Sequence, residues 1–394
     1  MRYRRFGRTE LQMPLITCGG MRYQHKWDDI PWSEVPEEGQ KNIERIVDKA
    51  HSFGIRHIET ARGYGSSEMQ LGPILANYPR EDWILQTKVS PSEDPKTFLA
   101  NFEKSMDYLK VDTIDLFSMH GINNETVFDH AMRKGGCMDI ARRLRKEGRV
   151  KHIGFSTHAG TRVILDTINS GEFDYVNLHW YFINELNWPA IEAATKHDMG
   201  VFIISPNDKG GKLYQPSEKL LELCQPLDPM VFNDLFCWLR PEVHTLSMGV
   251  SRPEDFDTHL EALDQLDSAG DLIAPVEERL RKEIREVTGI EWQAGWDKGF
   301  PEWESIPGHI HTREIVRLWM FAKALDMVEF GKMRYNLLGN GGHWFPGVKV
   351  QEFDDREMID LHSGSPFAAR IPGILGEAHA MLNAAEVKRQ SKGG

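Results

Sequence analysis

The sequence predicts an α/β fold, a closed (β/α)8 TIM barrel preceded by a small hairpin and followed by a small, mostly helical C-terminal domain. Eight short apolar runs, each followed by a helical pattern, occur within about the first 270 residues. Such alternation implies parallel strands joined by right-handed crossovers. An open doubly wound sheet is the competing fold, but it usually carries a G-x-G-x-x-G turn. Here Gly63-Tyr64-Gly65 is followed by Glu68 where the third glycine would stand, which favours the barrel.

The elements follow one another with regular spacing. The two strands of the hairpin, at 2–6 and 11–14, are expected to plug the bottom of the barrel. The barrel strands are predicted at 15–20, 55–60, 83–89, 113–120, 152–157, 175–180, 200–206 and 245–250. The helices are predicted at 41–53, 67–77, 95–109, 137–147, 160–169, 189–197, 229–239 and 253–268. The first helix shows the one-sided apolar spacing of an amphipathic helix.

The alternation stops after residue 270. Helical patterns at 275–287, 312–329, 356–358 and 374–382 alternate with turn residues and tryptophans. We therefore predict two domains, a barrel over 1–270 and a helical domain over 271–394.

Composition excludes several classes of function. The formal net charge of -12 disfavours a nucleic-acid-binding surface, which needs clustered Lys and Arg. No apolar run approaches the length of a membrane span, and the N-terminus lacks the apolar region of a signal peptide. The four cysteines form no CxxC pair, so neither a disulfide framework nor a thiolate zinc site is expected. The sequence predicts a cytoplasmic protein and leaves its oligomeric state open.

Four polar residues mark the ends of three consecutive strands. Glu59, Lys88 and His120 stand at strand ends, and Tyr64 lies in the loop after Glu59. Because the carboxyl ends of the strands meet at one mouth of a barrel, we expect these side chains to lie together. Each residue alone is more often a solvated rim residue than a catalyst. Four compatible groups in this order indicate a site.

Their chemistry suits the reduction of a carbonyl group. A nearby ammonium favours the anion of a phenol, so Lys88 is expected to lower the pKa of Tyr64, while Glu59 keeps Lys88 charged. His120 could hydrogen-bond a substrate oxygen. The set can protonate a carbonyl oxygen while a hydride reaches its carbon. None of these side chains can donate a hydride, so a cofactor is required.

This pattern resembles that of the aldo-keto reductase family. The matching residues are Glu59, Tyr64-Gly65-Ser66-Ser67-Glu68, Leu71-Gly72, Lys88 and His120, with similar segments at 154–157, 175–177 and 205–206. The resemblance covers residues 1–268. It implies a TIM barrel that binds NADPH or NADH without a Rossmann fold and reduces a small-molecule carbonyl substrate. It also implies that Tyr64 is the general acid, that Lys88 and Glu59 tune it, and that His120 orients the carbonyl.

The resemblance also suggests cofactor ligands. The family ordinarily has Asp where this chain has Glu59, so we expect an intact site with altered tuning. Ser156 and Asn177 are the expected partners of the nicotinamide amide. A helix N-terminus near Ser251, with Arg252, suits the adenosine phosphate, which favours NADP(H) and leaves NAD(H) open. Lys209-Gly210-Gly211-Lys212 could clamp the pyrophosphate, with an ordinary basic turn as the equal alternative. Ser205 is a further candidate cofactor ligand.

The C-terminal region is similar to the ferredoxin-like region of one branch of the family. That region binds iron–sulfur clusters through cysteine runs, but no cysteine follows Cys237. We therefore expect a cluster-free relic that packs by burial of Trp, Leu and Ile. The histidine pairs His309/His311 and His158/His179 are interpreted as solvated or core residues rather than as a metal site.

Two other functions remain open. The chain could be a nucleotide-binding sensor or scaffold with weak or no turnover. It could also be a glycosidase that uses Glu59 with a second rim carboxylate. Nicotinamide binding would argue against the glycosidase, and turnover would argue against the sensor.

Overall fold

The computed structural model describes residues 1–293 and 295–384. The described chain divides into two compact units. The first contains Met1–Gly210 and Asn233–Ala269, and the second contains Gly211–Phe232 and the described residues from Gly270 onward. A single division at residue 270 did not anticipate that Gly211–Phe232 groups with the second unit. Part of the C-terminal segment assigned to the helical domain, 385–394, lies outside the described residues.

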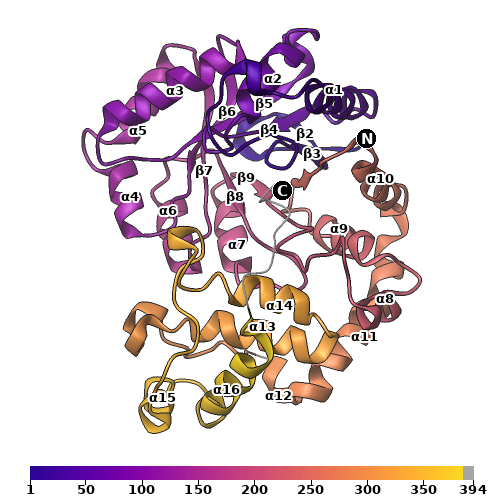
Figure 1. Cartoon of the computed structure of the whole chain (residues 1–394), viewed down its shortest axis with the longest axis vertical. Coiled ribbons are helices and arrows are strands. Elements are labelled where there is room, and N and C mark those ends of the chain that lie inside the picture. The colour runs from indigo at the N-terminus through magenta and orange to yellow at the C-terminus, as the bar shows by residue number, and fades with distance from the viewer. Residues whose placement is uncertain (294, 385–394) are drawn as a thin grey trace. The chain divides into compact units, whose positions relative to one another are not determined.

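The first unit contains a closed barrel of eight parallel strands (Figure 1). Its strands are β3 (Ile16–Gly19), β4 (His57–Glu59), β5 (Ile84–Val89), β6 (Ile114–His120), β7 (Val150–Ser156), β8 (Tyr175–Leu178), β9 (Gly200–Ile203) and β10 (Thr245–Gly249). They follow chain order, and β10 closes the ring by pairing with both β3 and β9. The predicted barrel is confirmed, and the open doubly wound sheet is excluded.

Helices follow the strands in the expected order. In the first unit they are α1 (Glu37–Ser52), α2 (Ser67–Leu75), α3 (Pro95–Leu109), α4 (Glu125–Met132), α5 (Cys137–Lys146), α6 (Thr161–Asn169), α7 (Trp188–Lys196) and α10 (Asp257–Asp264). α9 (Pro229–Trp238) spans the boundary between the units. Amphipathic faces drive the packing, since the buried residues of α1 are Ile43, Ile46, Val47 and Ala50.

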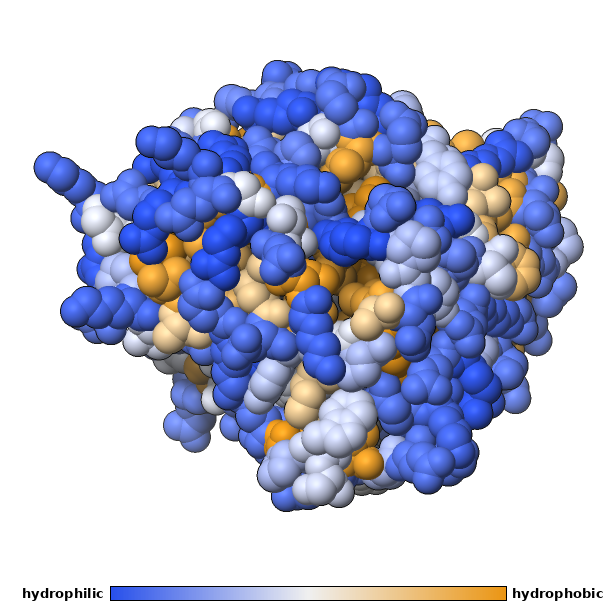
Figure 2. Space-filling model, turned by 90° about the horizontal axis from the view of Figure 1, so that it is seen from above, coloured by the Kyte–Doolittle hydropathy of each residue, from blue (hydrophilic) through white to orange (hydrophobic). Residues whose placement is uncertain are grey.

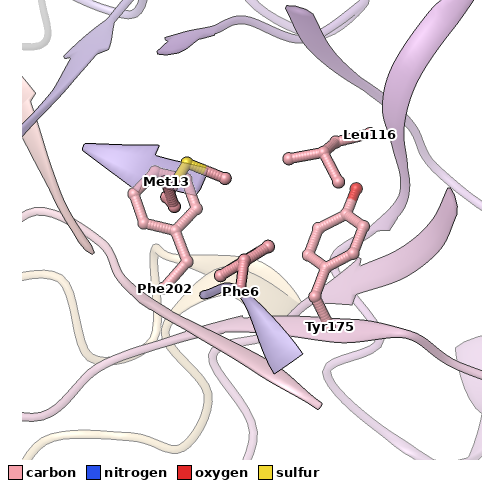
Figure 3. Close-up of a cluster of buried hydrophobic side chains, with 5 residues drawn as sticks. All are labelled: Phe6, Met13, Leu116, Tyr175 and Phe202. Atoms are coloured by element: carbon pink, nitrogen blue, oxygen red, sulfur yellow. The ribbon is translucent and has the colours of Figure 1, made fainter. Parts of the chain in front are cut away.

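The hairpin closes the bottom of the barrel, as the sequence predicted. Its strands β1 (Tyr3–Arg5) and β2 (Gln12–Pro14) pair antiparallel. Phe6 and Met13 are fully buried and pack with three barrel side chains (Figure 3), which are Leu116, Tyr175 and Phe202. A Cβ atom on Gly200 would lie only 2.6 Å from atoms of the Phe6 ring. A side chain at position 200 would therefore displace the plug.

A second glycine makes room for an aromatic ring inside the barrel. A Cβ on Gly154, in β7, would lie 2.4–2.5 Å from the ring of Tyr175 on the neighbouring strand β8. Real Cβ contacts do not approach so closely, so the full burial of Tyr175 depends on the missing side chain. The Tyr175 hydroxyl shares a 2.8 Å hydrogen bond with Ser118 of β6.

The helices that were not predicted include two short ones, α4 and α8 (Glu218–Cys224). α4 has eight residues and α8 has seven, too few to show a clear helical period. Their N-caps define them instead, because the Asn124 side chain accepts a hydrogen bond from the Val127 N–H and Ser217 accepts one from the Leu220 N–H.

The second unit is mainly helical. Besides α8, its elements include α11 (Ala269–Thr288), which begins at the unit boundary, α12 (Ile290–Gln293), α13 (Thr312–Leu325), α14 (Val328–Tyr335), α15 (Asp355–Leu361) and α16 (Ile371–Leu382). The predicted helix 312–329 is divided at Asp326, which adopts a left-handed conformation with φ of 53°. The core is aromatic, since buried Trp292 packs on Phe367 and Trp319 with ring centroids 4.7 and 6.1 Å apart.

The visible surface is predominantly hydrophilic. Figure 2 shows one face, on which apolar side chains occupy separate areas among polar ones. Within the described residues, no helix combines the length and apolarity that crossing a bilayer would require.

Candidate active site

The carboxyl ends of β4, β5 and β6 bring the four predicted residues together. Glu59 and His120 are the last residues of β4 and β6, and Lys88 is the penultimate residue of β5. All three are buried, with exposed fractions of 3%, 8% and 1% respectively. Tyr64 follows in the loop after β4 and is partly exposed. These side chains therefore lie at one mouth of the barrel, where their positions at strand ends led us to expect them.

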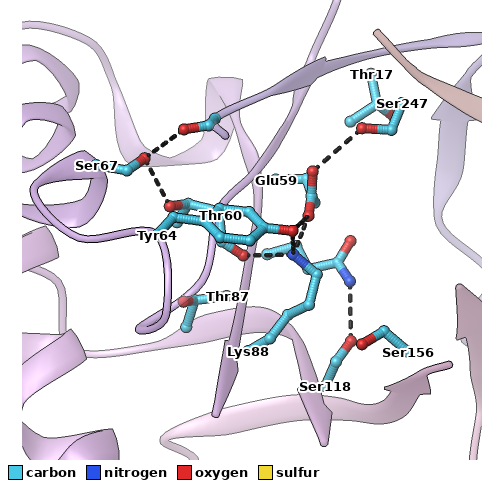
Figure 4. A network of polar contacts seen from close by, with 12 residues as sticks. Thr17, Glu59, Thr60, Tyr64, Ser67, Thr87, Lys88, Ser118, Ser156 and Ser247 are labelled. Atoms are coloured by element: carbon cyan, nitrogen blue, oxygen red, sulfur yellow. Dashed lines mark hydrogen bonds and ion pairs between the residues drawn. The ribbon is translucent and has the colours of Figure 1, made fainter. Parts of the chain in front are cut away.

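Lys88 is the centre of the polar contacts (Figure 4). Its Nζ donates hydrogen bonds to the Tyr64 hydroxyl at 3.2 Å, to the carbonyl oxygen of Thr60 at 2.8 Å and to Oε1 of Glu59 in a very short ion pair. The Tyr64 hydroxyl lies 3.3 Å from the same carboxylate oxygen. A phenol, an ammonium and a carboxylate thus share one small volume.

His120 contacts the tyrosine from the next strand. The His120 and Tyr64 rings lie edge to face, with centroids 5.6 Å apart and an interplanar angle of 83°. A Cβ on Gly63 would lie 3.7 Å from the imidazole. The Tyr64 loop is held close to residues 26 and 27, because a Cβ on Gly65 would lie 2.0 Å from the carbonyl oxygen of Lys26. The geometry leaves the His120 imidazole beside the tyrosine, where it can meet a substrate oxygen.

Burial controls the protonation of the central pair. Burial of the hydroxyl raises the pKa of Tyr64 above its ordinary value. Burial also lowers the pKa of Lys88 well below that of a solvated lysine, whereas the adjacent Glu59 carboxylate favours the ammonium. The sequence analysis expected Lys88 to lower the pKa of Tyr64, and the net direction is the opposite because desolvation of a phenolate outweighs the ammonium. Tyr64 therefore retains its proton at neutral pH, as a general acid must.

Glu59 has a second partner that the sequence analysis did not identify. Its other oxygen, Oε2, accepts a hydrogen bond from the Ser247 hydroxyl at 3.2 Å. Ser247 belongs to β10, which is far from β4 in the sequence but pairs with β3 in the closed barrel. The longer side chain at position 59 therefore reaches both Lys88 and β10.

Ser156 and Asn177 lie next to each other across β7 and β8. They are register partners, and His120 is the register partner of Ser156 on the other side. Asn177 is fully buried, and neither its Oδ1 nor its Nδ2 has a hydrogen-bond partner among the described residues. Buried amides are normally paired. Asn177 thus offers an acceptor and a donor beside Ser156.

Two of the three candidates after β9, Ser205 and Lys209, are joined by a backbone hydrogen bond. Ser205 adopts a left-handed conformation with φ of 54°, and its carbonyl accepts a hydrogen bond from the Lys209 N–H at 3.0 Å. The Lys209 ammonium contacts His158 and His179 at 3.2 and 3.4 Å. Gly211 is the first residue of the second unit.

At the candidate phosphate site after β10, the hydrogen-bond donors already have a carboxylate as partner. Asp255 accepts hydrogen bonds from the backbone and hydroxyl of Ser251, both at 2.8 Å, and from the Arg252 guanidinium at 3.0 Å. The Arg252 side chain is 70% exposed. The Arg252 guanidinium is therefore accessible to solvent, but it and Ser251 already donate hydrogen bonds to the Asp255 carboxylate. A phosphate would have to share Arg252 with Asp255.

The fold and this rim define a class of protein. A closed (β/α)8 barrel with a buried polar constellation at the carboxyl ends of its strands has the site location that is typical of barrel enzymes.

Part of the sequence is similar to one known family. Residues 15–167 match the sequence model described as "Aldo/keto reductase family". An aldo-keto reductase of Mycobacterium sp. (strain JLS) is 34% identical over 142 residues, which cover 34% of this chain and 48% of that protein. A glyoxal reductase of Bacillus subtilis is 29% identical over 140 residues, 34% of this chain and 47% of that protein. The chain thus spans about half the length of these relatives.

Solved structures match over a larger part of the chain. The holo form of the aldo-keto reductase AKR11C1 from Bacillus halodurans aligns with a TM-score of 0.58 at 19% identity, covering 71% of this chain and 96% of that one. The thermostable aldo-keto reductase Tm1743 aligns with a TM-score of 0.57 at 18% identity, covering 69% and 100%. At such identities the structural likeness shows the fold. The sequence likeness to aldo/keto reductases is confined to residues 15–167 for the family model.

Proposed function

We propose that this protein is an oxidoreductase that reduces a small aldehyde or ketone with a nicotinamide cofactor. The observation that carries the proposal is the contact of the Tyr64 hydroxyl with Lys88 and Glu59 at the barrel mouth, beside His120. The family match supports the reaction class. The four buried thiols suit a reducing, cytoplasmic setting.

The residues present fit a nicotinamide ring. A carboxamide has one carbonyl acceptor and one NH2 donor, and the buried Asn177 offers the complementary pair of atoms without partners among the described residues. Ser156, whose Oγ accepts a 3.1 Å hydrogen bond from the Gly121 N–H, is its neighbour on β7. A reduced nicotinamide held there supplies a hydride to the carbonyl carbon.

The protein's own groups handle the carbonyl oxygen. Tyr64 holds its proton at neutral pH and gives it to the oxygen as negative charge develops there. Lys88 donates to the Tyr64 hydroxyl and so stabilises the phenolate that remains. Glu59 holds the ammonium in place through its ion pair. His120 lies against the tyrosine ring and orients the oxygen between the two side chains.

One experiment tests the proposal. The purified protein is titrated with NADPH and NADH by fluorescence, and oxidation of each is then followed with a panel of aldehydes and ketones that includes butanal and glyoxal. We expect saturable binding and turnover of at least one carbonyl. Binding without turnover across the panel would instead support a nucleotide sensor, and the lack of nicotinamide binding would contradict both functions.

We further propose that NADP(H) is preferred over NAD(H), with Arg252 contacting the adenosine phosphate. A hydrogen bond to a charged group contributes about 1.5–3 kcal/mol, so Arg252→Ala should raise the Kd for NADPH about tenfold or more and leave the Kd for NADH nearly unchanged. Arg143→Ala, which also removes a surface arginine paired with a carboxylate, is the control. Equal effects on the two cofactors would contradict this role for Arg252.

A further inference from the structure

Arg62 lies in the loop between β4 and α2, two residues before Tyr64, and its side chain joins three segments of the barrel mouth. Its guanidinium forms short ion pairs with Glu68 of α2 and with Asp29 of the loop after β3. It also donates to the Gly65 carbonyl oxygen at 3.2 Å. Because only 10% of the side chain is exposed, Arg62 is a largely buried cation, and the proposed mechanism does not use it.

The contacts of Arg62 hold the chain on both sides of Tyr64. Its backbone N–H donates to the Lys88 carbonyl oxygen at 2.9 Å, which fixes the loop before Tyr64 to β5. Its guanidinium binds the Gly65 carbonyl oxygen, which fixes the loop after Tyr64. The tyrosine therefore stands on a short segment that one arginine closes from both ends.

Glu68 extends this connection to the strand of Lys88. The residue is fully buried, and its Oε1 accepts a hydrogen bond from the Thr87 hydroxyl at 2.5 Å. Thr87 is the neighbour of Lys88 on β5. The other carboxylate oxygen forms the ion pair with Arg62. Through Arg62 and Glu68, the loop of Tyr64 is thus tied to the strand that carries the ammonium.

Asp29 connects Arg62 to the loop after β3. The carboxylate binds Arg62 through Oδ1 and the Lys104 ammonium through Oδ2, the latter at 2.6 Å. Two residues earlier, the Trp27 ring packs edge to face against the Tyr64 ring, with centroids 6.3 Å apart and an interplanar angle of 84°. The loop that contacts the tyrosine ring is therefore held by the same guanidinium.

The geometry of this junction suits a guanidinium. Its planar fork donates to several acceptors at fixed angles, whereas a lysine presents a point charge on a flexible chain. The Arg62 guanidinium also lies 4.8 Å from the centroid of the Tyr108 ring, a cation–π contact that fixes its plane. Precise placement matters because a displacement of about 1 Å near a reacting group can cost about 100-fold in rate.

We infer that Arg62 is a positioning residue that holds the Tyr64 hydroxyl at its distance from Lys88. It does so by joining Glu68 and Asp29, which belong to the two segments packed around the tyrosine. The inference rests on the proposed function, because it gives Arg62 a part in proton transfer from Tyr64. Since Arg62 acts on the rate through the tyrosine, its replacement lowers kcat and leaves the affinities for cofactor and carbonyl unchanged.

Arg62→Lys tests this role because it keeps a cation beside Glu68 while removing the planar fork. With an aldehyde that the wild type reduces, kcat should fall about tenfold or more, while KM and the Kd for NADPH stay within about twofold. Arg149→Lys is the matched control, since Arg149 pairs with both oxygens of Glu103 at 2.7 Å and lies 5.0 Å from the Phe102 ring. Arg149 precedes β7, at the other end of the barrel, so its kcat should stay within about twofold of wild type.

Two double variants separate positioning from a loss of folding. Arg62→Met with Glu68→Gln removes both charges of the buried ion pair, which can be nearly neutral for stability. This variant should fold, as thermal unfolding verifies, and show the same fall in kcat. In a Tyr64→Phe background, Arg62→Lys should change the remaining rate by less than about twofold, because effects that act through one residue are not additive. A fall of about tenfold in both backgrounds, or a kcat within about twofold of wild type in Arg62→Lys and in Arg62→Met with Glu68→Gln, would overturn the inference.

A spectroscopic measurement distinguishes failure of this inference from failure of the proposed function. The nine tyrosines of the chain are labelled with carbon-13, and the ring signals of Tyr64 are assigned by their loss in Tyr64→Phe. Tyr64 signals that shift or broaden in Arg62→Lys, and not in Arg149→Lys, support positioning even if the wild type reduces no carbonyl. Tyr64 signals that stay unchanged in Arg62→Lys would contradict it, and turnover by the wild type would then leave the reductase function intact.

Discussion

Replacing Tyr64 with phenylalanine is expected to abolish carbonyl reduction while leaving cofactor binding intact. The change removes only the hydroxyl that contacts Lys88 and Glu59, and the ring can keep its edge-to-face contact with His120. General acid catalysis supplies about 100- to 10000-fold in rate, so kcat should fall within that range. The measurement is NADPH oxidation at saturating aldehyde, together with NADPH fluorescence.

Tyr3→Phe provides the matched control for this substitution. It also removes one phenolic hydroxyl, which donates to the Gly54 carbonyl oxygen at 2.7 Å, but it lies in the hairpin at the bottom of the barrel. Its kcat should stay within about twofold of wild type, since surface substitutions usually change stability by less than about 0.5 kcal/mol. A loss of less than about tenfold in Tyr64→Phe would remove Tyr64 from the role of acid.

Replacing Lys88 with methionine is expected to lower both stability and turnover. The substitution leaves the Glu59 carboxylate 97% buried without its ammonium, since only 3% of the residue is exposed. Breaking a buried pair in this way costs about 3–5 kcal/mol. The free energy of unfolding, measured with urea, should fall by that amount, and turnover should fall as well because the Tyr64 phenolate loses its stabilising cation.

The double variant Lys88→Met with Glu59→Gln separates the two effects. Removing both charges of a buried pair can be nearly neutral for stability, so the double variant should recover most of the lost free energy of unfolding. Turnover should remain low, because the ammonium beside the Tyr64 hydroxyl is still missing. If the double variant regained activity together with stability, Lys88 would have only a structural role.

Much of the fold could be predicted because the barrel repeats one pattern. Each buried strand is a short apolar run and each covering helix has an apolar face, so periodicity located all eight strands and most helices. Strand ends could be assigned as a site because parallel strands share one mouth. Glu59, Lys88 and His120 were identified in this way, and Tyr64 through its position in the following loop.

Features that depend on contacts across the ring could not be read from local sequence. Ser247 reaches Glu59 only because β10 closes onto β3. The sequence analysis did not consider Asp255, whose carboxylate accepts hydrogen bonds from Ser251 and Arg252, where a phosphate was expected. His158 and His179 were interpreted as solvated or core residues, and their contact with Lys209 was not anticipated. The spacing of these residues along the chain does not show that they contact one another across the barrel.

The pKa of Tyr64 could not be predicted for a different reason. Sequence analysis considered the charge of Lys88 and not the loss of water around the hydroxyl, which acts in the opposite direction. The depth of a side chain in a site is a property of the whole barrel and is visible only once the loops are in place.

The floor formed by the hairpin has a practical consequence for handling the protein. An affinity tag or surface anchor joined ahead of Met1 would lie next to β1, at the end of the barrel remote from Tyr64. In immobilised molecules the end of the barrel that carries Tyr64 should therefore face away from the support. Trimming the first 14 residues would instead uncover Tyr175 and Phe202, and an exposed apolar area of this kind promotes aggregation.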